Sequence, residues 1–277
     1  MLNSRTELNS LANNAVVPIL NNARLNTLDI PLPPLSTQQR IADILDKADA
    51  LRRKDKALLK KYDALAQAIF MNMFGDPVKN EKGWEVRKLG EVCTKITDGT
   101  HFSPPSQAEG IPYITAKHVK KGKVDFYSNP TYVSEEHHKE IYLRCTPVKG
   151  DVLYIKDGAT TGIAAVNEYD FAFSMLSSLA LIKPNIKILN SYYLVAWLNN
   201  EKVKEDYIRN YMAGAAIRRF TLDKLKRFEL FVPPIELQNS FEIIVKNLFE
   251  QSQIVFGKQS ETLFHSLLQS AFEGDLL

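Results

Sequence analysis

Residues that could contact a phosphate or a base edge gather in one short stretch of the chain. Residues 117–123 read Lys-His-Val-Lys-Lys-Gly-Lys, with four lysines and one histidine around a glycine turn. Lysines at this density suit contact with phosphate oxygens, and the histidine could read a base edge. A solvated turn would show the same pattern, because charge runs most often face water. The candidate contact residues are Lys117, His118, Lys120, Lys121 and Lys123.

A second polar loop follows an expected strand. Residues 156–162 read Lys-Asp-Gly-Ala-Thr-Thr-Gly, and such a loop could bring backbone N–H groups and hydroxyls to phosphates. An ordinary hairpin turn is the alternative interpretation. The candidates in this loop are Lys156, Thr160 and Thr161, and Arg218 adds a cation near the end of the same region.

A third loop, Asp98-Gly99-Thr100-His101, is followed by Pro104-Pro105 and should be structured. His101 has two open interpretations, a functional side chain or a residue that only caps the loop.

Patterns that would indicate catalysis are missing or incomplete. There is no glycine-rich phosphate loop and no Gly-x-Ser-x-Gly motif, and the pair His137-His138 and the distant cysteines lack zinc spacing. The string Asn129-Pro130-Thr131-Tyr132 resembles the Asn-Pro-Pro-Tyr motif of adenine-N6 methyltransferases. It departs at the second proline, and the glycine-rich loop for S-adenosylmethionine is absent. We therefore expect no catalytic residue, no metal and no cofactor.

The composition is ordinary for a soluble globular protein, with 45% hydrophobic and 24% charged residues. The net charge of +3 is too small to indicate a nucleic-acid partner by itself. Two cysteines argue against a disulfide scaffold and favour a reducing compartment. No apolar run approaches the roughly 20 residues of a membrane span, and the first residues lack a signal-peptide pattern. We expect a cytoplasmic protein.

The elements that would position these residues are revealed by an internal repeat. Residues 33–41 read Pro-Pro-Leu-Ser-Thr-Gln-Gln-Arg-Ile, and residues 233–241 read Pro-Pro-Ile-Glu-Leu-Gln-Asn-Ser-Phe. The two copies also end alike, with Phe74-Gly75-Asp76 against Phe272-Glu273-Gly274-Asp275. Two copies cannot make a solenoid, so they predict two like elements that bracket one insert.

Each copy predicts a long helix. In residues 36–74 apolar residues recur at heptad spacing, at positions 41, 44, 48, 51, 58, 62, 65 and 69. Ser36 or Thr37 is the expected N-cap, with Gln39 completing a capping box. Asp55 occupies an apolar slot, where it either fixes the register or marks a place where the helix leaves its partner. Residues 236–274 repeat the pattern more weakly, with Gly257 in the middle.

The two expected helices carry opposite charge. Residues 36–74 hold eight Lys and Arg against five Asp, whereas residues 236–274 hold two Lys against five Glu. Opposite charge favours pairing of the helices and sets the choice of partner more than the stability. The basic cluster at residues 52–61 could pair with the acidic helix, contact phosphates or simply face water.

The insert has a different character. Short β-rich runs between turn signals predict strands at residues 92–96, 112–116, 124–126, 151–155, 162–166 and 177–183. Residues 190–200 and 201–209 should be helical, and residues 28–32 look like a strand. The expected fold class is α+β, with one mixed β-rich domain bracketed by two long helices that form an antiparallel coiled-coil spacer. The expected boundaries are 1–34 for the remnant of a domain end, 35–75, 76–232 and 233–277.

At this point the sequence resembles the DNA-specificity subunit of type I restriction-modification systems. The stretch 28–41 and the helix to Asp76 are similar to the family's spacer, and Trp84–Val92 resembles the start of its target recognition domain. Ile96–His101 and Gly150–Tyr154 are similar to strings inside such domains. Ala215–Leu277 resembles the end of the domain and the second spacer.

The resemblance implies a subunit without catalytic activity. Each recognition domain of the family reads one half of a split target in double-stranded DNA, and the paired spacer helices act as a ruler. Modification subunits, which bind S-adenosylmethionine, and a restriction subunit with motor activity dock on it. A complete member carries two recognition domains and this chain has one, so we expect a half subunit, by nature or by truncation. We expect two copies to form a homodimer through the spacer helices.

Three functional classes remain open at this stage. The first is the DNA-reading specificity subunit, and the second is an enzyme related to adenine-N6 DNA methyltransferases. The third is a coiled-coil adaptor without a DNA role. Binding of S-adenosylmethionine by the purified chain would favour the second, and a lack of salt-sensitive DNA binding would favour the third.

Overall fold

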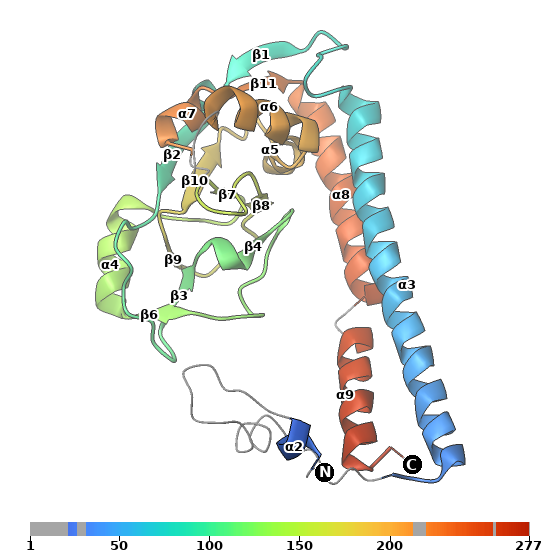
Figure 1. The fold of residues 1–277 in the computed structure, drawn as a ribbon. Coiled ribbons are helices and arrows are strands. Elements are labelled where there is room, and N and C mark those ends of the chain that lie inside the picture. Colours follow the sequence, from blue (N-terminus) through green and yellow to red (C-terminus); the bar gives the residue numbers. More distant parts are fainter. Residues whose placement is uncertain (1–21, 27–31, 213–219, 257–258, 277) are drawn as a thin grey trace. The chain divides into compact units, whose positions relative to one another are not determined.

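The Pro-Pro motif that occurs twice in the sequence precedes a long helix both times. After the first copy, α3 runs over Leu35–Phe74. After the second, α8 runs over Ile235–Phe256 and α9 over Gln259–Glu273. The prediction of two long helices around one insert is confirmed (Figure 1).

The computed structural model describes residues 22–26, 32–212, 220–256 and 259–276. The chain divides into two compact units, which we treat separately. The helical unit comprises Met1–Asp63 and Phe249–Leu277, and the mixed unit comprises Ala64–Leu248. The strand expected at residues 28–32 lies almost entirely outside the described residues, and so does Gly257.

The expected N-cap at Ser36 or Thr37 is wrong. The helix already begins at Leu35, and the backbone N–H of Thr37 donates to the carbonyl of Pro34 at 2.9 Å. The second copy starts in the same way, because the N–H of Leu237 donates to Pro234 at 3.0 Å. The proline carbonyl therefore opens the helix before the residues whose side chains favour capping.

A glutamine then fixes each helix start. Gln38 Nε2 donates to the carbonyl of Pro33 at 2.7 Å, and Gln238 Nε2 donates to that of Pro233 at the same distance. The side chain spans the first turn and donates to a carbonyl that lies just before the helix, because the N–H groups of Thr37 and Leu237 donate to the second proline of each pair instead. The glutamine five residues after the first proline is thus part of the motif.

In the helical unit, α3 and α9 run antiparallel and meet through opposite charges. Glu261 on α9 accepts from Arg52 Nη1 at 3.4 Å and lies 3.1 Å from Lys56 Nζ. The Arg52 guanidinium also lies 4.4 Å from the ring centre of Phe264. Arg52 and Lys56 thus pair with the acidic helix, as one interpretation of the basic cluster predicted. Leu51, a member of the expected apolar stripe, is exposed, and so is Leu65 in the part of α3 that belongs to the mixed unit.

In the mixed unit, the end of α3 meets the start of α8 through aromatic rings. Phe241 packs against Phe70 and Phe74 with centroid distances of 5.7 and 5.4 Å. Tyr193 stacks on Phe70 at 5.6 Å and meets Phe74 at 4.7 Å. These rings belong to a core that continues into the domain, so packing rather than charge joins the helices here. The α+β fold class with an antiparallel pair of long helices is confirmed.

The strands of the mixed unit form one larger sheet and three small ones. The larger sheet is antiparallel with order β2-β10-β7-β8, and the small sheets are β6-β3-β9, β1-β11 and β4-β5. Each of the six strands expected in the insert overlaps an observed one, and no end differs by more than two residues. The strands are β1 (Glu85–Lys88), β2 (Cys93–Asp98), β3 (Ile111–Ile114), β4 (Val119–Lys120), β5 (Lys123–Val124), β6 (Tyr132–Val133), β7 (Val152–Ile155), β8 (Ala164–Val166), β9 (Ser174–Met175), β10 (Leu179–Pro184) and β11 (Glu229–Val232).

Both faces of the larger sheet are buried. Along β7, Val152 and Tyr154 join the core beneath the helices, whereas Leu153 and Ile155 join a second core with Phe126 and its neighbours. This alternation follows from the two-residue period of a strand. A strand buried on both faces reads as a continuous apolar run, which is why this segment could be predicted.

Helices complete the mixed unit. The sequence did not predict the helix α4, because its residues are strongly polar. In the structure Ile141 is its buried residue. Its N-cap is Ser134, whose hydroxyl accepts from the N–H of His137. None of the helices that the structure describes has the length and apolar character that a membrane crossing needs. The shorter helix α2 (Asn22–Leu25) belongs to the helical unit. Those of the mixed unit are α4 (Glu135–Arg144), α5 (Ser191–Leu198), α6 (Glu201–Met212) and α7 (Leu222–Lys226).

Candidate nucleic-acid interface

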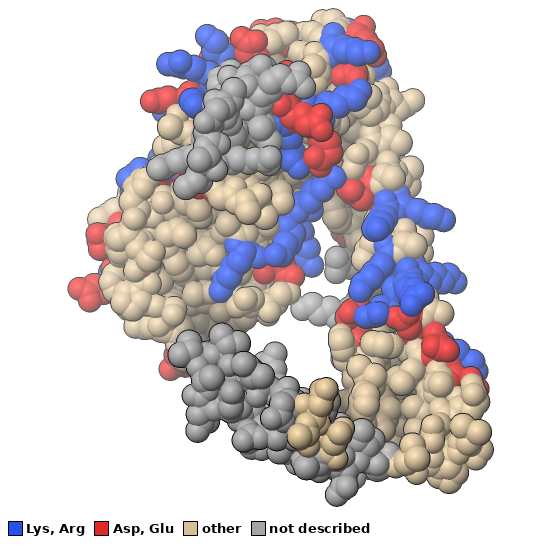
Figure 2. All heavy atoms as spheres, viewed as in Figure 1, with Lys and Arg blue, Asp and Glu red and all other residues tan. Residues whose placement is uncertain are grey.

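The lysine-rich stretch forms a small hairpin on the mixed unit. The strands β4 and β5 pair Val119 with Val124 and Lys120 with Lys123. The valines are buried and the lysines are exposed, as the alternation of a strand requires. Lys121 and Gly122 make the turn, and Gly122 has a φ of 76° that suits glycine. We call residues 117–129 the lysine hairpin region; basic side chains gather over this part of the unit (Figure 2).

The hairpin is attached to the larger sheet. The N–H of Gly122 donates to the carbonyl of Ala164 on β8 at 2.9 Å. Lys120 Nζ donates to the carbonyl of Lys117 at 2.7 Å, and Lys117 Nζ donates to Asn129 Oδ1 at 3.2 Å. Both amines belong to exposed residues. The structure therefore brings Lys117, Lys120, Lys121 and Lys123 together on an outward-facing hairpin.

The structure corrects the expectation for His118. Its side chain is 0% exposed, so it cannot read a base edge as expected. Its Nδ1 accepts from the N–H of Thr115 at 2.9 Å, and its Nε2 donates to the carbonyl of Asn129 at 2.8 Å. These two bonds fix the neutral ring in one tautomer and tie together the two ends of the lysine hairpin region. Asn129, the first residue of the methyltransferase-like string, thus has a part in this loop.

The protonation of His118 gives a pH prediction. Burial lowers the pKa of His118 below its ordinary value of 6.5, and the nearby Lys117 and Lys120 lower it further, against the bond to Asn129 and the charge of Asp125. The unfolded chain takes up the proton first as the pH falls below about 6.5. The stability contributed by neutral His118 is therefore present above that pH and is lost toward the lower pKa of the folded state.

We expect the melting temperature of the protein to fall more steeply below pH 6.5 than that of the His118→Gln variant, which cannot titrate there. Thermal unfolding followed between pH 5 and pH 8 checks this. The pKa of His138 is lowered by burial as well, and the comparison cancels its effect because both proteins retain it. Parallel curves would show that His118 is not the titrating group.

The loop at residues 156–162 is the β7–β8 hairpin connection. The N–H of Gly162 donates to the carbonyl of Ile155 at 2.9 Å and closes the turn. Lys156 is only 2% exposed, and its Nζ lies 2.7 Å from Asp157 Oδ2. Thr161 is also buried, and its hydroxyl donates to the carbonyl of Gly158 at 2.7 Å. The expectation that Lys156 and Thr161 reach a phosphate is therefore corrected, whereas Thr160 is exposed.

Arg218, the last of the expected contact residues, lies outside the described residues.

Arg144 was not singled out in the sequence, and in the structure it forms a cluster with the Asp98 loop. Its Nη2 donates to Asp98 Oδ1 at 2.6 Å and lies 3.4 Å from His101 Nε2. The apolar pattern of the sequence did not predict α4. Its position in the last turn of this helix therefore could not draw attention to Arg144.

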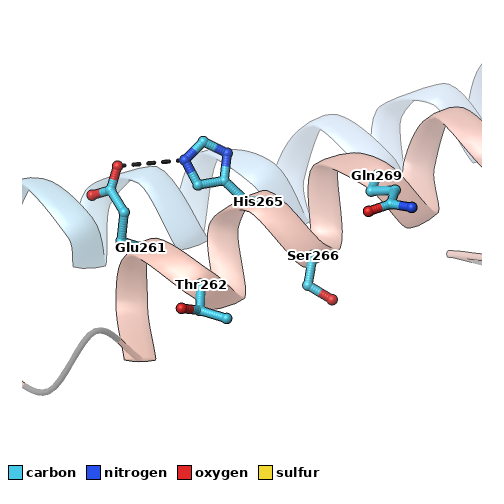
Figure 3. A pocket seen from close by; sticks show the side chains of 5 residues that line it. All are labelled: Glu261, Thr262, His265, Ser266 and Gln269. Carbon is cyan, nitrogen blue, oxygen red and sulfur yellow. Dashed lines mark ion pairs between the residues drawn. The ribbon is translucent and has the colours of Figure 1, made fainter. Parts of the chain in front are cut away.

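An open hollow on the helical unit has no catalytic arrangement. Its lining comes from α9 alone, and the side chains of Glu261 and His265 pair at 3.5 Å (Figure 3). Glu261 is already engaged by Arg52 and Lys56. The hollow is therefore a polar surface of the helix pair. Its lining residues are Glu261, Thr262, His265, Ser266 and Gln269.

Comparison with known proteins places this geometry in a family. Residues 1–61 and 81–262 match the family described as "Type I restriction modification DNA specificity domain". The type I restriction enzyme MjaIX specificity subunit of Methanocaldococcus jannaschii is 25% identical over 262 residues, which cover 88% of this chain and 59% of that protein. The EcoBI specificity subunit of Escherichia coli is 25% identical over 301 residues, which cover 97% and 63%.

A solved structure shows the same fold. The S subunit of a type I restriction-modification system from M. genitalium has a TM-score of 0.54 at 17% identity, covering 96% of this chain and 67% of that one. The chain spans about three fifths of the length of the curated relatives it matches. Because the family match extends over most of the sequence, the chain belongs to the family of type I restriction-modification DNA specificity domains.

Proposed function

We propose that this chain is the DNA-reading specificity component of a type I restriction-modification enzyme and that residues 76–232 read one half of a split target. The family match supports this proposal. The observation that carries it is the lysine hairpin region, which turns exposed cations outward from the domain. The component reads DNA without catalysing a reaction, and modification and restriction subunits dock on it. The cytoplasm, where its DNA would be found, is the proposed location.

The proposed contacts follow from the exposed side chains. Lys117, Lys120, Lys121 and Lys123 approach phosphates, which supplies affinity without sequence information. Thr160, exposed in the β7–β8 connection, is the proposed hydroxyl contact, and Arg218 stays a candidate from the sequence. Because each neutralised phosphate releases bound counterions, the affinity should fall steeply with salt.

The double variant Lys120→Ala/Lys121→Ala tests this interface. We expect weaker binding to every duplex and a smaller slope of log K against log salt, by about 0.9 for each phosphate that the variant no longer neutralises. Titration of a labelled duplex at several salt concentrations measures both quantities. The double variant Lys187→Ala/Lys226→Ala removes the same charge elsewhere on the mixed unit and should retain most of the slope. Equal slopes for the hairpin variant and the unmodified chain would remove the hairpin from the interface.

We also propose that two copies associate through the spacer helices and so present two reading domains. Support comes from apolar side chains that the helical unit leaves in contact with water, such as Leu35 at 79% and Phe272 at 63% exposure. Light scattering on the purified chain should give twice the mass of one chain at micromolar concentration. A strict monomer would contradict the association.

A further inference from the structure

The loop after β2 is fixed in place by its backbone. The N–H of Thr100 donates to the carbonyl of Met175 at 2.9 Å, and the N–H of Ser177 donates to the carbonyl of Thr100 at 2.8 Å. A Cβ on Gly99 would lie 2.0 Å from the Met175 oxygen, so only glycine permits this approach. Asp98, at the end of β2, is therefore held at a defined position.

The carboxylate of Asp98 lies between a buried cation and an exposed one. Lys156 Nζ is 3.6 Å from Asp98 Oδ2, and both side chains are buried. On the outer side, Arg144 Nη2 donates to Asp98 Oδ1 at 2.6 Å. The Arg144 side chain itself is 52% exposed. A buried acid thus orients a guanidinium that still faces solvent.

Two rings accompany this guanidinium at the surface. His101 Nε2 lies 3.4 Å from Arg144 Nη2 and 3.5 Å from Asp98 Oδ2, and Phe102 beside it is also exposed. The Phe102 ring lies 5.9 Å from the ring of His137, at the start of α4. The Asp98 loop and α4 therefore present a cation and an aromatic ring on one rigid platform.

We propose that Arg144 is a specificity-determining residue that donates to the O6 and N7 acceptors of a guanine in the major groove, and that Asp98 is its positioning residue. The inference rests on the proposed DNA-reading function and adds a base contact to it. An arginine fork against guanine is the commonest specific side-chain contact to a base. None of the expected contact residues that the structure describes is an arginine.

The charges favour a base edge over a phosphate. Asp98 and Asp157 carry two negative charges, and Lys156 and Arg144 carry two positive charges, so the cluster offers little net attraction to an anion. An oriented guanidinium can grip a phosphate or a base edge, but a phosphate contact draws its strength from net positive charge. Here the orientation is fixed while the charge is balanced. That combination suits the neutral acceptors of a base.

The test is selection of bound duplexes from a randomised pool, followed by sequencing. The unmodified chain should enrich a motif that contains a G·C pair. Arg144→Gln should lose the preference at that pair by about tenfold or more and keep the other positions. Arg144→Lys, which retains the charge but not the fork, should lose it as well. The control Lys139→Gln removes a charge from the exposed face of the same helix and should leave the motif unchanged.

The remaining outcomes distinguish a failure of the Arg144 assignment from a failure of the proposed DNA-reading function. The same motif from both Arg144 variants, or a motif without a G·C pair, would overturn the assignment. Uniformly weaker binding of Arg144→Gln with an unchanged motif would make Arg144 a phosphate contact and overturn it too. Absence of any salt-sensitive binding or motif from the unmodified chain would contradict the proposed function itself. Asp98→Asn should weaken the base preference at the same G·C pair and leave the other positions of the motif unchanged. A melting curve of this variant confirms that it folds.

Discussion

Replacing Phe241 by alanine should lower the free energy of unfolding of the mixed unit by about 3–5 kcal/mol, the range for truncating a buried phenylalanine. Phe241 is fully buried at the start of α8, where it meets Phe70 and Phe74 from the end of α3. Truncation removes both ring contacts and leaves a cavity between three helices, since Tyr193 of α5 lines the same place. Denaturation with guanidinium chloride measures the change.

The control is Ile186→Ala, because Ile186 lies in the same mixed unit and is 79% exposed. An exposed side chain contributes little, so this variant should stay within about 0.5 kcal/mol of the unmodified protein. If Phe241→Ala cost as little as the control, the two long helices would not be joined through this cluster.

Gln238→Leu should cost about 2–4 kcal/mol, because it leaves several buried backbone groups without a partner. Gln238 is fully buried, and its Nε2 donates to the carbonyls of Pro233 at 2.7 Å and Ile188 at 3.0 Å. Its Oε1 accepts from the N–H of Asn190 at 2.8 Å. One side chain thus ties the start of α8 to the loop before α5, and a leucine of similar size can replace none of these bonds.

The internal repeat supplies the control. Gln38 occupies the same place in the first copy, where, among the residues that the structure describes, its side chain bonds only to Pro33, and the residue is partly exposed. Gln38→Leu should therefore cost about 0.5–1.5 kcal/mol, the net value of one hydrogen bond. Chemical denaturation gives the loss of unfolding free energy for each variant. The difference between the two losses measures the bonds of Gln238 to Ile188 and Asn190, which tie α8 to the loop before α5. Equal losses would show that Gln238 acts only within its own helix.

The helices and the larger sheet could be predicted because their signals are periodic. The heptad spacing predicted α3, and the β-rich run at residues 151–155 predicted a strand, whose burial on both faces the structure then showed. The helix α4 has few apolar residues, and its start depends on one hydroxyl of Ser134. The capping prediction failed because residue preference favoured Ser36, whereas the Pro34 carbonyl and Gln38 decide the helix start.

The candidate site could be predicted only in part, since a sequence shows which residues are polar but not which way they face. Lys120 and Lys123 alternate with buried valines and are exposed, as a hairpin predicts. His118 and Lys156 are buried because backbone groups and carboxylates from distant residues satisfy them. The pair of Asp98 and Arg144 joins residues from β2 and α4, which no local pattern connects.

The measurement that tests the central claim most directly is a map of methylated adenines. The chain would be co-expressed with a candidate modification subunit, the proposed partner, and genomic DNA would be sequenced for modified bases. The account predicts methylation at a split target only when the chain is present, with the motif altered by Arg144→Gln. Methylation that is the same with and without the chain would contradict its role as the DNA-reading component.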